Sequence, residues 1–267
     1  MKRRLRPGSV ALWAVTIFGF AYLLIPIITI AVFSFNDPSG KFNTKWEGFT
    51  LKYWKHPFAR ADFTDALKTS LLVALIAGAI ATVLGSLIAL ALVRYRFKGG
   101  KFIDLFLILP LTTPEIIMGA SLFTLFFNWG WRRGLTTIII AHTLFCLAFV
   151  SMTVKARLRG FDWTLEDAAM DLGSPPMRTF MKVTMPLILP GVVAAFMLSL
   201  ALSIDDYIIT SFIAGEEKTF PREVFDSARV EIPPQVHILA TMIMVVAITI
   251  LVGSTIASNR RAARELS

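Results

Sequence analysis

The segment that decides the fold reads TLEDAAMDLGSPPMRTFMKVTMPLILP, from Thr164 to Pro190. It is largely polar in its first half, and it lies between two long apolar runs of the chain. A polar segment in that position predicts a pair of short helices held outside a membrane, where another protein can bind them.

Local signals indicate where these two helices begin and end. Thr164, with Asp167 three residues later, fits a capping box at the start of the first helix. Gly173 is expected to end it, because glycine adopts a left-handed backbone without strain. Ser174 and Pro175 then fit the start of a second helix. Apolar residues recur along the first helix at helical spacing, at Leu165, Ala168, Ala169 and Leu172.

The composition places the chain among membrane proteins. Of its 267 residues 55% are hydrophobic and 17% are charged, whereas a soluble domain averages about 25% charged. The net charge of +9 is attributed to anionic lipid and to the bias of basic residues toward the cytoplasm. We therefore expect membrane lipid and no nucleic acid among the partners. The single cysteine, Cys146, excludes an intrachain disulfide.

The apolar runs predict an all-α integral membrane protein with six transmembrane helices. Their expected bounds are about residues 10–35, 69–93, 102–127, 134–154, 187–215 and 232–259. The chain is divided accordingly into a first helix with a periplasmic loop, a core of five helices, and a cytoplasmic tail, at residues 1–65, 66–257 and 258–267. In the second helix small residues repeat every four positions, which favours close helix packing; they are Ala77, Ala81, Gly85 and Ala89.

The basic residues predict the orientation. Six crossings put both ends on one side, and that side also holds the 94–101 loop and the Thr164–Pro190 segment. Lysine and arginine are more numerous on this side, so we expect both termini and the segment to face the cytoplasm.

No motif of an enzyme is present. The sequence contains no GxxxxGK[ST], GxSxG or HExxH pattern. His56, His142 and His237 are dispersed, without a second ligand at metal-binding spacing, so structural or interfacial roles are expected for them. We predict no catalytic residue, no metal site and no cofactor bound by this chain.

Carboxylates within the predicted spans are candidates for a substrate path, because a charge in the bilayer normally faces a cavity or a partner. Asp206 shares a helical face with Ser199, Ser203 and Thr210. Our hypothesis is that Asp206 and Glu115 line a path that favours cations. Asp205 points about 100° away from Asp206 in a continuous helix and is expected to be paired within the protein.

Two other interpretations of these carboxylates stay open. In the first, the Asp205–Asp206 pair only ends a helix near the outer surface; in the second, Glu115 is a buried packing partner.

The Thr164–Pro190 segment resembles the EAA motif, E-A-A-x3-G-x9-I-x-L-P, of transmembrane subunits of type I ABC importers. Here it reads Asp167-Ala168-Ala169, then Gly173, then Val183-Thr184-Met185-Pro186, with every spacing matched. Asp, Val and Met replace the usual Glu, Ile and Leu. The resemblance implies a coupling helix at about residues 164–173 that docks on a cytoplasmic ATPase. The docking residues would be Leu165, Asp167, Ala168, Ala169 and Gly173, with Pro186 completing the motif.

Several further stretches resemble the spermidine/putrescine branch of this family. They are ALVRYRFKGGKF (91–102), LPLTTPEIIMGASLF (109–123), HTLFCLAFV (142–150), VKARLRGFD (154–162) and LSIDDYIITSFIAG (202–215). The resemblance implies a permease of the bacterial inner membrane that pairs with a related permease, an ATPase dimer and an extracytoplasmic binding protein. ATP and magnesium would be bound by the ATPase. A polyamine is the implied solute, with another small amine, an opine-type compound or another cationic solute as the alternative.

A stand-alone secondary transporter or channel is the competing class, because it also needs carboxylates in its spans. It offers no reason for a capped cytoplasmic helix pair, and six spans without an internal repeat are few for a carrier. An intramembrane enzyme would need paired catalytic residues, which the sequence does not offer.

Overall fold

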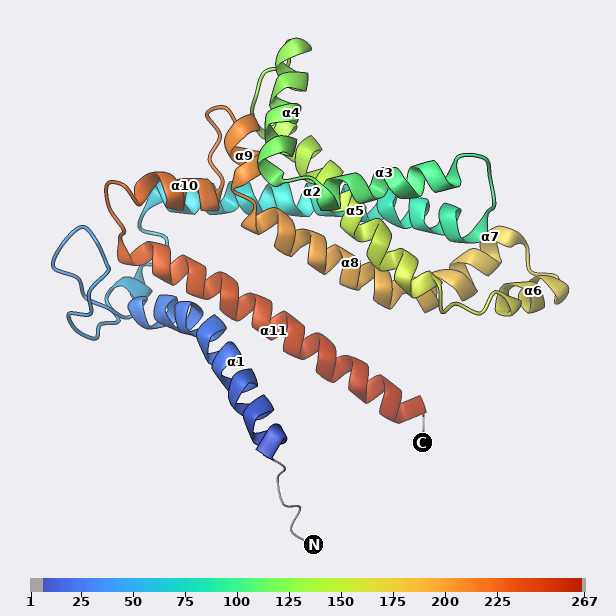
Figure 1. Cartoon of the computed structure of the whole chain (residues 1–267), viewed down its shortest axis with the longest axis horizontal. Coiled ribbons are helices and arrows are strands. Elements are labelled where there is room, and N and C mark those ends of the chain that lie inside the picture. Colours follow the sequence, from blue (N-terminus) through green and yellow to red (C-terminus); the bar gives the residue numbers. More distant parts are fainter. Residues whose placement is uncertain (1–6, 266–267) are drawn as a thin grey trace, which may run out of the picture. The chain divides into compact units, whose positions relative to one another are not determined.

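The computed structural model describes residues 7–265 (Figure 1). Side chains are described from Leu12 to Ile250 and at 252, 253 and 256. In this range the regular structure is helical, and the only extended pairings are two isolated bridges, Asn36–Phe49 and Phe42–Ile232. The basic residues expected at the N-terminus, Lys2, Arg3, Arg4 and Arg6, lie outside the described residues.

The chain divides into two compact units, one of residues 1–64 with 224–267 and the other of residues 65–223. In the first unit, helix α1 (Pro7–Phe33) packs against helix α11 (Pro234–Glu265). The loop after α1 contains the 3-10 helix η1 (Tyr53–Lys55), which also contacts α11. The segment expected as a separate tail, residues 258–267, belongs to α11 as far as Glu265.

Polar contacts join the long first loop to the start of α11. The backbone N–H of Asn43 donates to the carbonyl of Ile232 at 2.9 Å. The guanidinium of Arg60 lies 2.6 Å from Asp62 and 2.5 Å from Glu231. These two carboxylates raise the pKa of Arg60 above its ordinary value. These contacts hold the loop against the residues just before α11, although Arg60 and Glu231 are 171 positions apart in the chain.

The second unit is built mainly from six helices. They are α2 (Ala61–Arg94, whose first turn lies in the first unit), α3 (Gly100–Thr112), α4 (Glu115–Asn128), α5 (Leu135–Leu158), α8 (Met185–Asp205) and α9 (Ile208–Ile213). Helix α5 is the centre of this unit and packs against α3, α8 and α9. Helix α4 packs against α9, and both stand together at one end of α5 (Figure 1). Helix α10 (Phe220–Ser227) follows α9 and crosses the boundary between the units.

Small residues bring α2 close to its neighbours, as their spacing predicts. Ala77, Ala81, Gly85 and Ala89 are all buried. A Cβ atom added to Gly85 would lie 2.7 Å from Val150 of α5, which is closer than two carbon atoms pack. The hydroxyl of Ser151 also donates to the carbonyl of Gly85 at 3.2 Å. Close packing of α2 against α5 is therefore confirmed.

The third predicted span, about residues 102–127, consists of two helices and not of the single helix that we expected. Helices α3 and α4 are bent by 109° at the break between them. Thr113, which precedes Pro114, is extended, with φ −78° and ψ 129°. The ring of a proline disfavours the helical conformation at the residue before it, so α3 ends at this point. The break places Glu115 in the first turn of α4.

Four helices of the described chain are long and apolar enough to cross a membrane, or five if α3 and α4 form one broken span. The four are Leu12–Phe33, Ala61–Arg94, Leu135–Leu158 and Pro176–Asp205. Helix α11 runs from Pro234 to Glu265, and the part whose side chains are described is apolar over Pro234–Ile250. The protein is thus an all-α, multi-pass membrane protein, and the sixth span stays a prediction.

Candidate functional site

The predicted coupling segment does form two short helices, α6 (Thr164–Asp171) and α7 (Pro176–Thr179). A π-helical turn, η2 (Phe180–Thr184), joins α7 to α8. The helix from Pro176 to Asp205 is therefore continuous with a membrane span, whereas α6 is connected to it through the turn at Gly173. In Figure 1, α6 and α7 lie together at the end of the second unit opposite α9.

The start of α6 differs from the expected capping box. Asp162, and not Thr164, supplies the capping oxygen: its carboxylate accepts the backbone N–H of Thr164 at 3.0 Å and the Thr164 hydroxyl at 2.8 Å. These two donors lower the pKa of Asp162 below its ordinary value. A sequence pattern cannot distinguish the two arrangements, because aspartate and threonine both cap helices. The second helix also begins one residue later than expected, at Pro176, without a side-chain cap.

Helix α6 is terminated at Gly173, as the sequence predicts. Gly173 has a φ of +84°, in the left-handed region that glycine adopts without strain. Its N–H donates to the carbonyl of Met170 at 2.9 Å, and the N–H of Ser174 donates to Ala169 at 3.1 Å. These two bonds form a Schellman motif, which satisfies the last carbonyls of the helix.

The residues that the motif implies for docking lie mostly at the surface of the chain. Leu165, Asp167, Ala168 and Gly173 are exposed, as is Pro186, whereas Ala169 is half-buried. Leu172 completes the apolar face and is 90% exposed. Together with the exposed Leu165 and Ala168 it forms an apolar patch on α6, and such patches mark contacts with a protein or a membrane.

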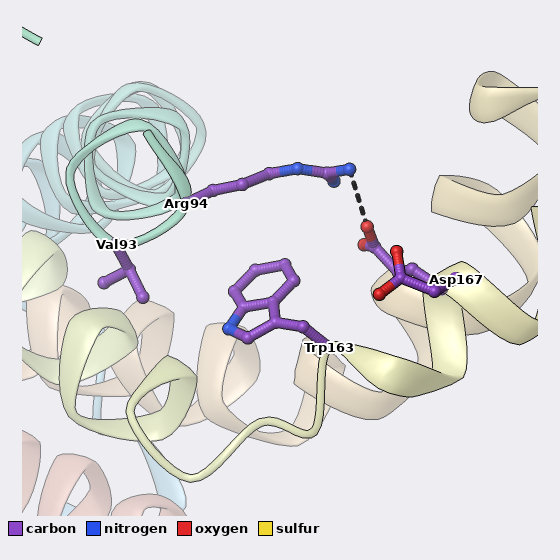
Figure 2. A pocket seen from close by; sticks show the side chains of 5 residues that line it. Val93, Arg94, Trp163 and Asp167 are labelled. Atoms are coloured by element: carbon purple, nitrogen blue, oxygen red, sulfur yellow. Dashed lines mark ion pairs between the residues drawn. The ribbon is translucent and has the colours of Figure 1, made fainter. Parts of the chain in front are cut away.

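One residue of α6 is buried, and sequence reasoning did not identify it. Glu166 is 3% exposed, and its carboxylate lies 2.7 Å from the guanidinium of Arg94 at the end of α2. The hydroxyl of Thr184, in η2, donates to the other carboxylate oxygen. Figure 2 shows Arg94 reaching from α2 toward α6, beside the ring of Trp163. Its guanidinium carbon is 5.5 Å from the centre of that ring, within the range of a cation–π contact.

These residues surround a pocket beside α6 (Figure 2). It is lined by Val93, Arg94, Trp163, Glu166 and Asp167. Position on α6 alone could not have identified Glu166, because it lies only about 100° around the helix from Leu165, whereas the exposed Asp167 lies closer to the opposite side. The burial of Glu166 depends on Arg94 and Thr184, which come from other elements.

A second polar cluster lies where α8 ends, at the predicted stripe. His142 of α5 is buried, with Nδ1 2.7 Å from the hydroxyl of Ser203 and Nε2 2.9 Å from the hydroxyl of Thr210. Asp206 is also buried, 3.2 Å from Nε2 of the same histidine. Ser199, one turn before Ser203, is buried as well. The four members of the stripe are therefore enclosed within the second unit, and three of them, Ser203, Asp206 and Thr210, contact a histidine that spacing alone did not connect with them.

Asp206 has a local role at the helix break. Its backbone is extended, with ψ 119°, so α8 ends at Asp205. Its carboxylate accepts the backbone N–H groups of Ile209 and Thr210, at 3.3 and 2.9 Å, and the Thr210 hydroxyl at 2.7 Å. Asp206 thus caps α9. This agrees with the interpretation in which the pair of aspartates ends a helix.

The environments of the two aspartates are the reverse of what we expected. Asp206 is the one paired within the protein, whereas Asp205 is exposed. The expectation assumed a continuous helix, and the 100° rotation has no meaning across a break. Glu115 is exposed too, so it is not a packing partner buried within this chain. Among the described residues no group of three or more His, Cys, Asp or Glu side chains could hold a metal ion.

Comparison with known proteins assigns the family. The family model described as "Binding-protein-dependent transport system inner membrane component" matches residues 81–263. The chain is 37% identical over 236 residues to the spermidine/putrescine transport system permease protein PotC of Escherichia coli K12, covering 88% of this chain and 89% of that one. It is 36% identical to the putrescine transport system permease protein PotI of the same strain, covering 87% and 85%.

Solved structures agree in fold. A bacterial ABC transporter involved in the import of alginate matches with a TM-score of 0.66 at 15% identity, over 94% of this chain and 96% of that one. An amino acid ABC transporter matches with a TM-score of 0.57 at 20% identity, over 79% and 97%. The match to the family model covers more than half of the chain, and it includes the coupling segment and both polar clusters. The chain belongs to the family of inner membrane components of binding-protein-dependent transport systems, the permeases of ABC importers.

Proposed function

We propose that this chain is a permease subunit of an ATP-driven importer for polyamines, of the spermidine or putrescine type. The observation that carries the proposal is the 37% identity to PotC, which extends over 88% of the chain. Similarity over that length includes the bent α3–α4 pair, the α8–α9 break and the coupling segment. PotI, whose name also specifies putrescine, is similar over nearly the same length.

The proposed assembly contains four kinds of subunit. This chain pairs with a related permease, two copies of an ATPase bind from the cytoplasm, and a binding protein delivers the solute from outside. ATP and magnesium belong to the ATPase. The chain crosses the inner membrane six times with both ends in the cytoplasm, α11 supplying the last crossing. The exposed apolar side of α6 supports docking to a partner, because Leu165 and Leu172 are 45% and 90% exposed within this chain.

Transport follows an alternating-access cycle in this proposal. ATP binding closes the ATPase dimer and draws the coupling helices together, and the spans repack to open toward the binding protein. The continuous helix from Pro176 to Asp205 suits this task, since a displacement near α7 is transmitted along a rigid element to the α8–α9 break.

The substrate path is assigned to the carboxylates at the two helix breaks. Glu115 and Asp205 are exposed on the isolated chain, and α4, which carries Glu115, packs against α9 just after Asp205. Both carboxylates can therefore meet a cationic solute at the surface shared with the second permease. Asp206, Ser203 and Thr210 act behind them by fixing the shape of the break. Another small amine, such as an opine-type compound, is the alternative solute for the same site.

The test is uptake by the reconstituted complex. The chain is purified with its sister permease, ATPase and binding protein, and proteoliposomes are loaded with ATP and given labelled spermidine or putrescine. We expect uptake that requires ATP and the binding protein, and that unlabelled polyamine inhibits more strongly than an opine-type amine. Uptake of neither polyamine, with transport of another amine by the same vesicles, would overturn the assignment of the solute.

A further inference from the structure

One buried carboxylate joins three segments of the second unit. Glu166 is the only residue of α6 that is buried, and its two oxygens have different partners. One faces the guanidinium of Arg94, at the last residue of α2, and the other accepts the hydroxyl of Thr184. Thr184 is completely buried and is the last residue of η2, directly before α8. We refer to Arg94, Glu166 and Thr184 as the α6 brace.

The brace is the main polar attachment of α6 to the membrane helices. The other contacts of the helix ends are local: Asp162 caps its start, and the Schellman bonds close its end. The outward side of α6 carries the exposed residues of the coupling motif. A force applied to that side therefore reaches α2 and α8 through Glu166, which is held from both directions.

The chemistry of the three groups suits a rigid joint. An ion pair with one partner 3% exposed is only weakly screened by solvent and salt. The Arg94 guanidinium is also held against the Trp163 ring. Thr184 lies in a π-helical turn, and such turns occur frequently at functional sites.

We propose that Glu166 is a positioning residue for coupling. Through Arg94 and Thr184 it makes α6, the end of α2 and the start of α8 move as one body when the ATPase acts. This inference rests on the proposed function as an ATP-driven importer, but it does not depend on which solute is carried. It concerns Glu166, directly before the first residue of the coupling motif, and Thr184, at a position that the motif leaves unspecified.

The first experiment compares three variants of the complete complex in proteoliposomes: Glu166→Gln, Arg94→Met and the two combined. Each preparation is normalised to the amount of assembled complex. The readouts are the stimulation of ATP hydrolysis by the loaded binding protein and the solute imported per ATP. We expect both to fall by roughly fivefold or more in the single variants, the range of a typical coupling between sites.

The combined variant gives the sharper test. Arg94→Met leaves a buried carboxylate without its cation, whereas the combined variant removes the charge as well. We therefore expect the combined variant to import more solute per ATP than Arg94→Met alone, a non-additivity typical of groups in direct contact. Glu223→Gln is the matched control. Like Glu166, Glu223 is a buried carboxylate with a basic partner, in this case Lys218 at 2.6 Å. It should keep wild-type coupling.

A second pair of variants covers the case in which Glu166→Gln does not assemble. Thr184→Val removes the hydroxyl at similar size, and Thr184→Ser retains it, so the valine variant should lose coupling and the serine variant should keep it. Wild-type solute per ATP in Thr184→Val, or in assembled Glu166→Gln, would overturn the role of the brace. A wrong polyamine assignment would be recognised separately, in the wild-type complex. There, ATP hydrolysis would still be stimulated by the binding protein, but neither polyamine would be imported.

Discussion

Two adjacent aspartates show how strongly the environment of a residue depends on the backbone around it. Asp205 is the last residue of α8 and is exposed, and Asp206 is buried under His142 and α9. Their neighbour Ser203 could be predicted from helical spacing within α8, whereas Thr210 lies beyond the break and joins the cluster through its bonds to Asp206 and His142. The assignment of the two carboxylates could not, since it depends on the residue at which the helix ends. His142 comes from another helix, and no local pattern connects it to the stripe.

The two aspartates should respond differently to loss of charge. In Asp206→Asn, an amide N–H replaces an oxygen that accepts from Thr210 and faces His142. The variant should lose about 1–3 kcal/mol of stability, the usual penalty for an unsatisfied buried group. The measurement is the thermal unfolding midpoint of the purified complex in detergent.

Asp205→Asn is the matched partner of this experiment. Its side chain is exposed, so the unfolding midpoint should stay at the wild-type value while uptake of the cationic solute falls several-fold. An unchanged uptake rate in Asp205→Asn, at normal protein level, would remove this residue from the proposed path. An unchanged midpoint in Asp206→Asn would contradict the capping role.

At the scale of elements, predictions from sequence were best where one residue type imposes one backbone conformation. Gly173 could be identified as the end of α6 because few other residues adopt a positive φ. The break before Pro114 also has a local cause, because a proline disfavours the helical conformation at the residue before it. A proline within an apolar run is, however, also compatible with a kinked continuous helix. The bend of 109° depends on the packing of α4 against α9, which the sequence of the segment does not specify.

The turn at Gly173 allows a direct test of the geometry of the coupling helix. Gly173→Val places a β-branched side chain at φ +84°, which costs about 1–2 kcal/mol and should unwind the end of α6. ATP-driven uptake should fall while the subunit still enters the membrane in normal amount. Gly160→Ala is the control, because the nearest atom to its added Cβ is 4.0 Å away. Normal uptake in Gly173→Val would show that the end of α6 need not be rigid.

The contact between α2 and α5 allows a second test at this scale. Gly85→Ala would put a methyl group 2.7 Å from Val150, and such overpacking typically costs 1–3 kcal/mol, hence about 2 here. The fraction of protein that elutes as folded complex in size-exclusion chromatography should decrease, and adding Val150→Ala should restore it. Gly19→Ala, with no atom within 4 Å of the added Cβ, should behave as wild type. Failure of the second substitution to rescue the first would place the close contact elsewhere.

For the whole molecule, composition and the distribution of apolar runs were sufficient to predict a multi-pass helical protein. The number of crossings is less directly readable, because α3 and α4 are only 13 and 14 residues long and are sharply bent. The mean hydropathy of a sequence window that includes the break does not reveal it. The packing within each of the two compact units depends on long-range contacts, for which one sequence contains no local signal.

Labelling of single cysteines tests the proposed crossing of the α3–α4 pair. Lys98→Cys precedes α3 and Arg132→Cys follows α4, in a chain whose native Cys146 is buried. If the pair crosses the bilayer, an impermeant thiol reagent should label these positions from opposite sides, with Lys98→Cys labelled from the cytoplasm. Met170→Cys, in α6, should also react only from the cytoplasm. Labelling of Lys98→Cys and Arg132→Cys from the same side would mean a re-entrant loop and one crossing fewer.

The short arms of the bent pair also have a consequence for biogenesis. Each arm is well below the roughly 20 apolar residues that the insertion machinery accepts as an independent segment, and the break leaves backbone groups that lipid cannot satisfy. We therefore expect residues 100–128 to remain at the translocon, without integrating into the bilayer, until α5 has been synthesised. Helix α3 packs against α5. A glycosylation reporter fused after residue 128 would then show poor integration, and one fused after residue 158 would show efficient integration.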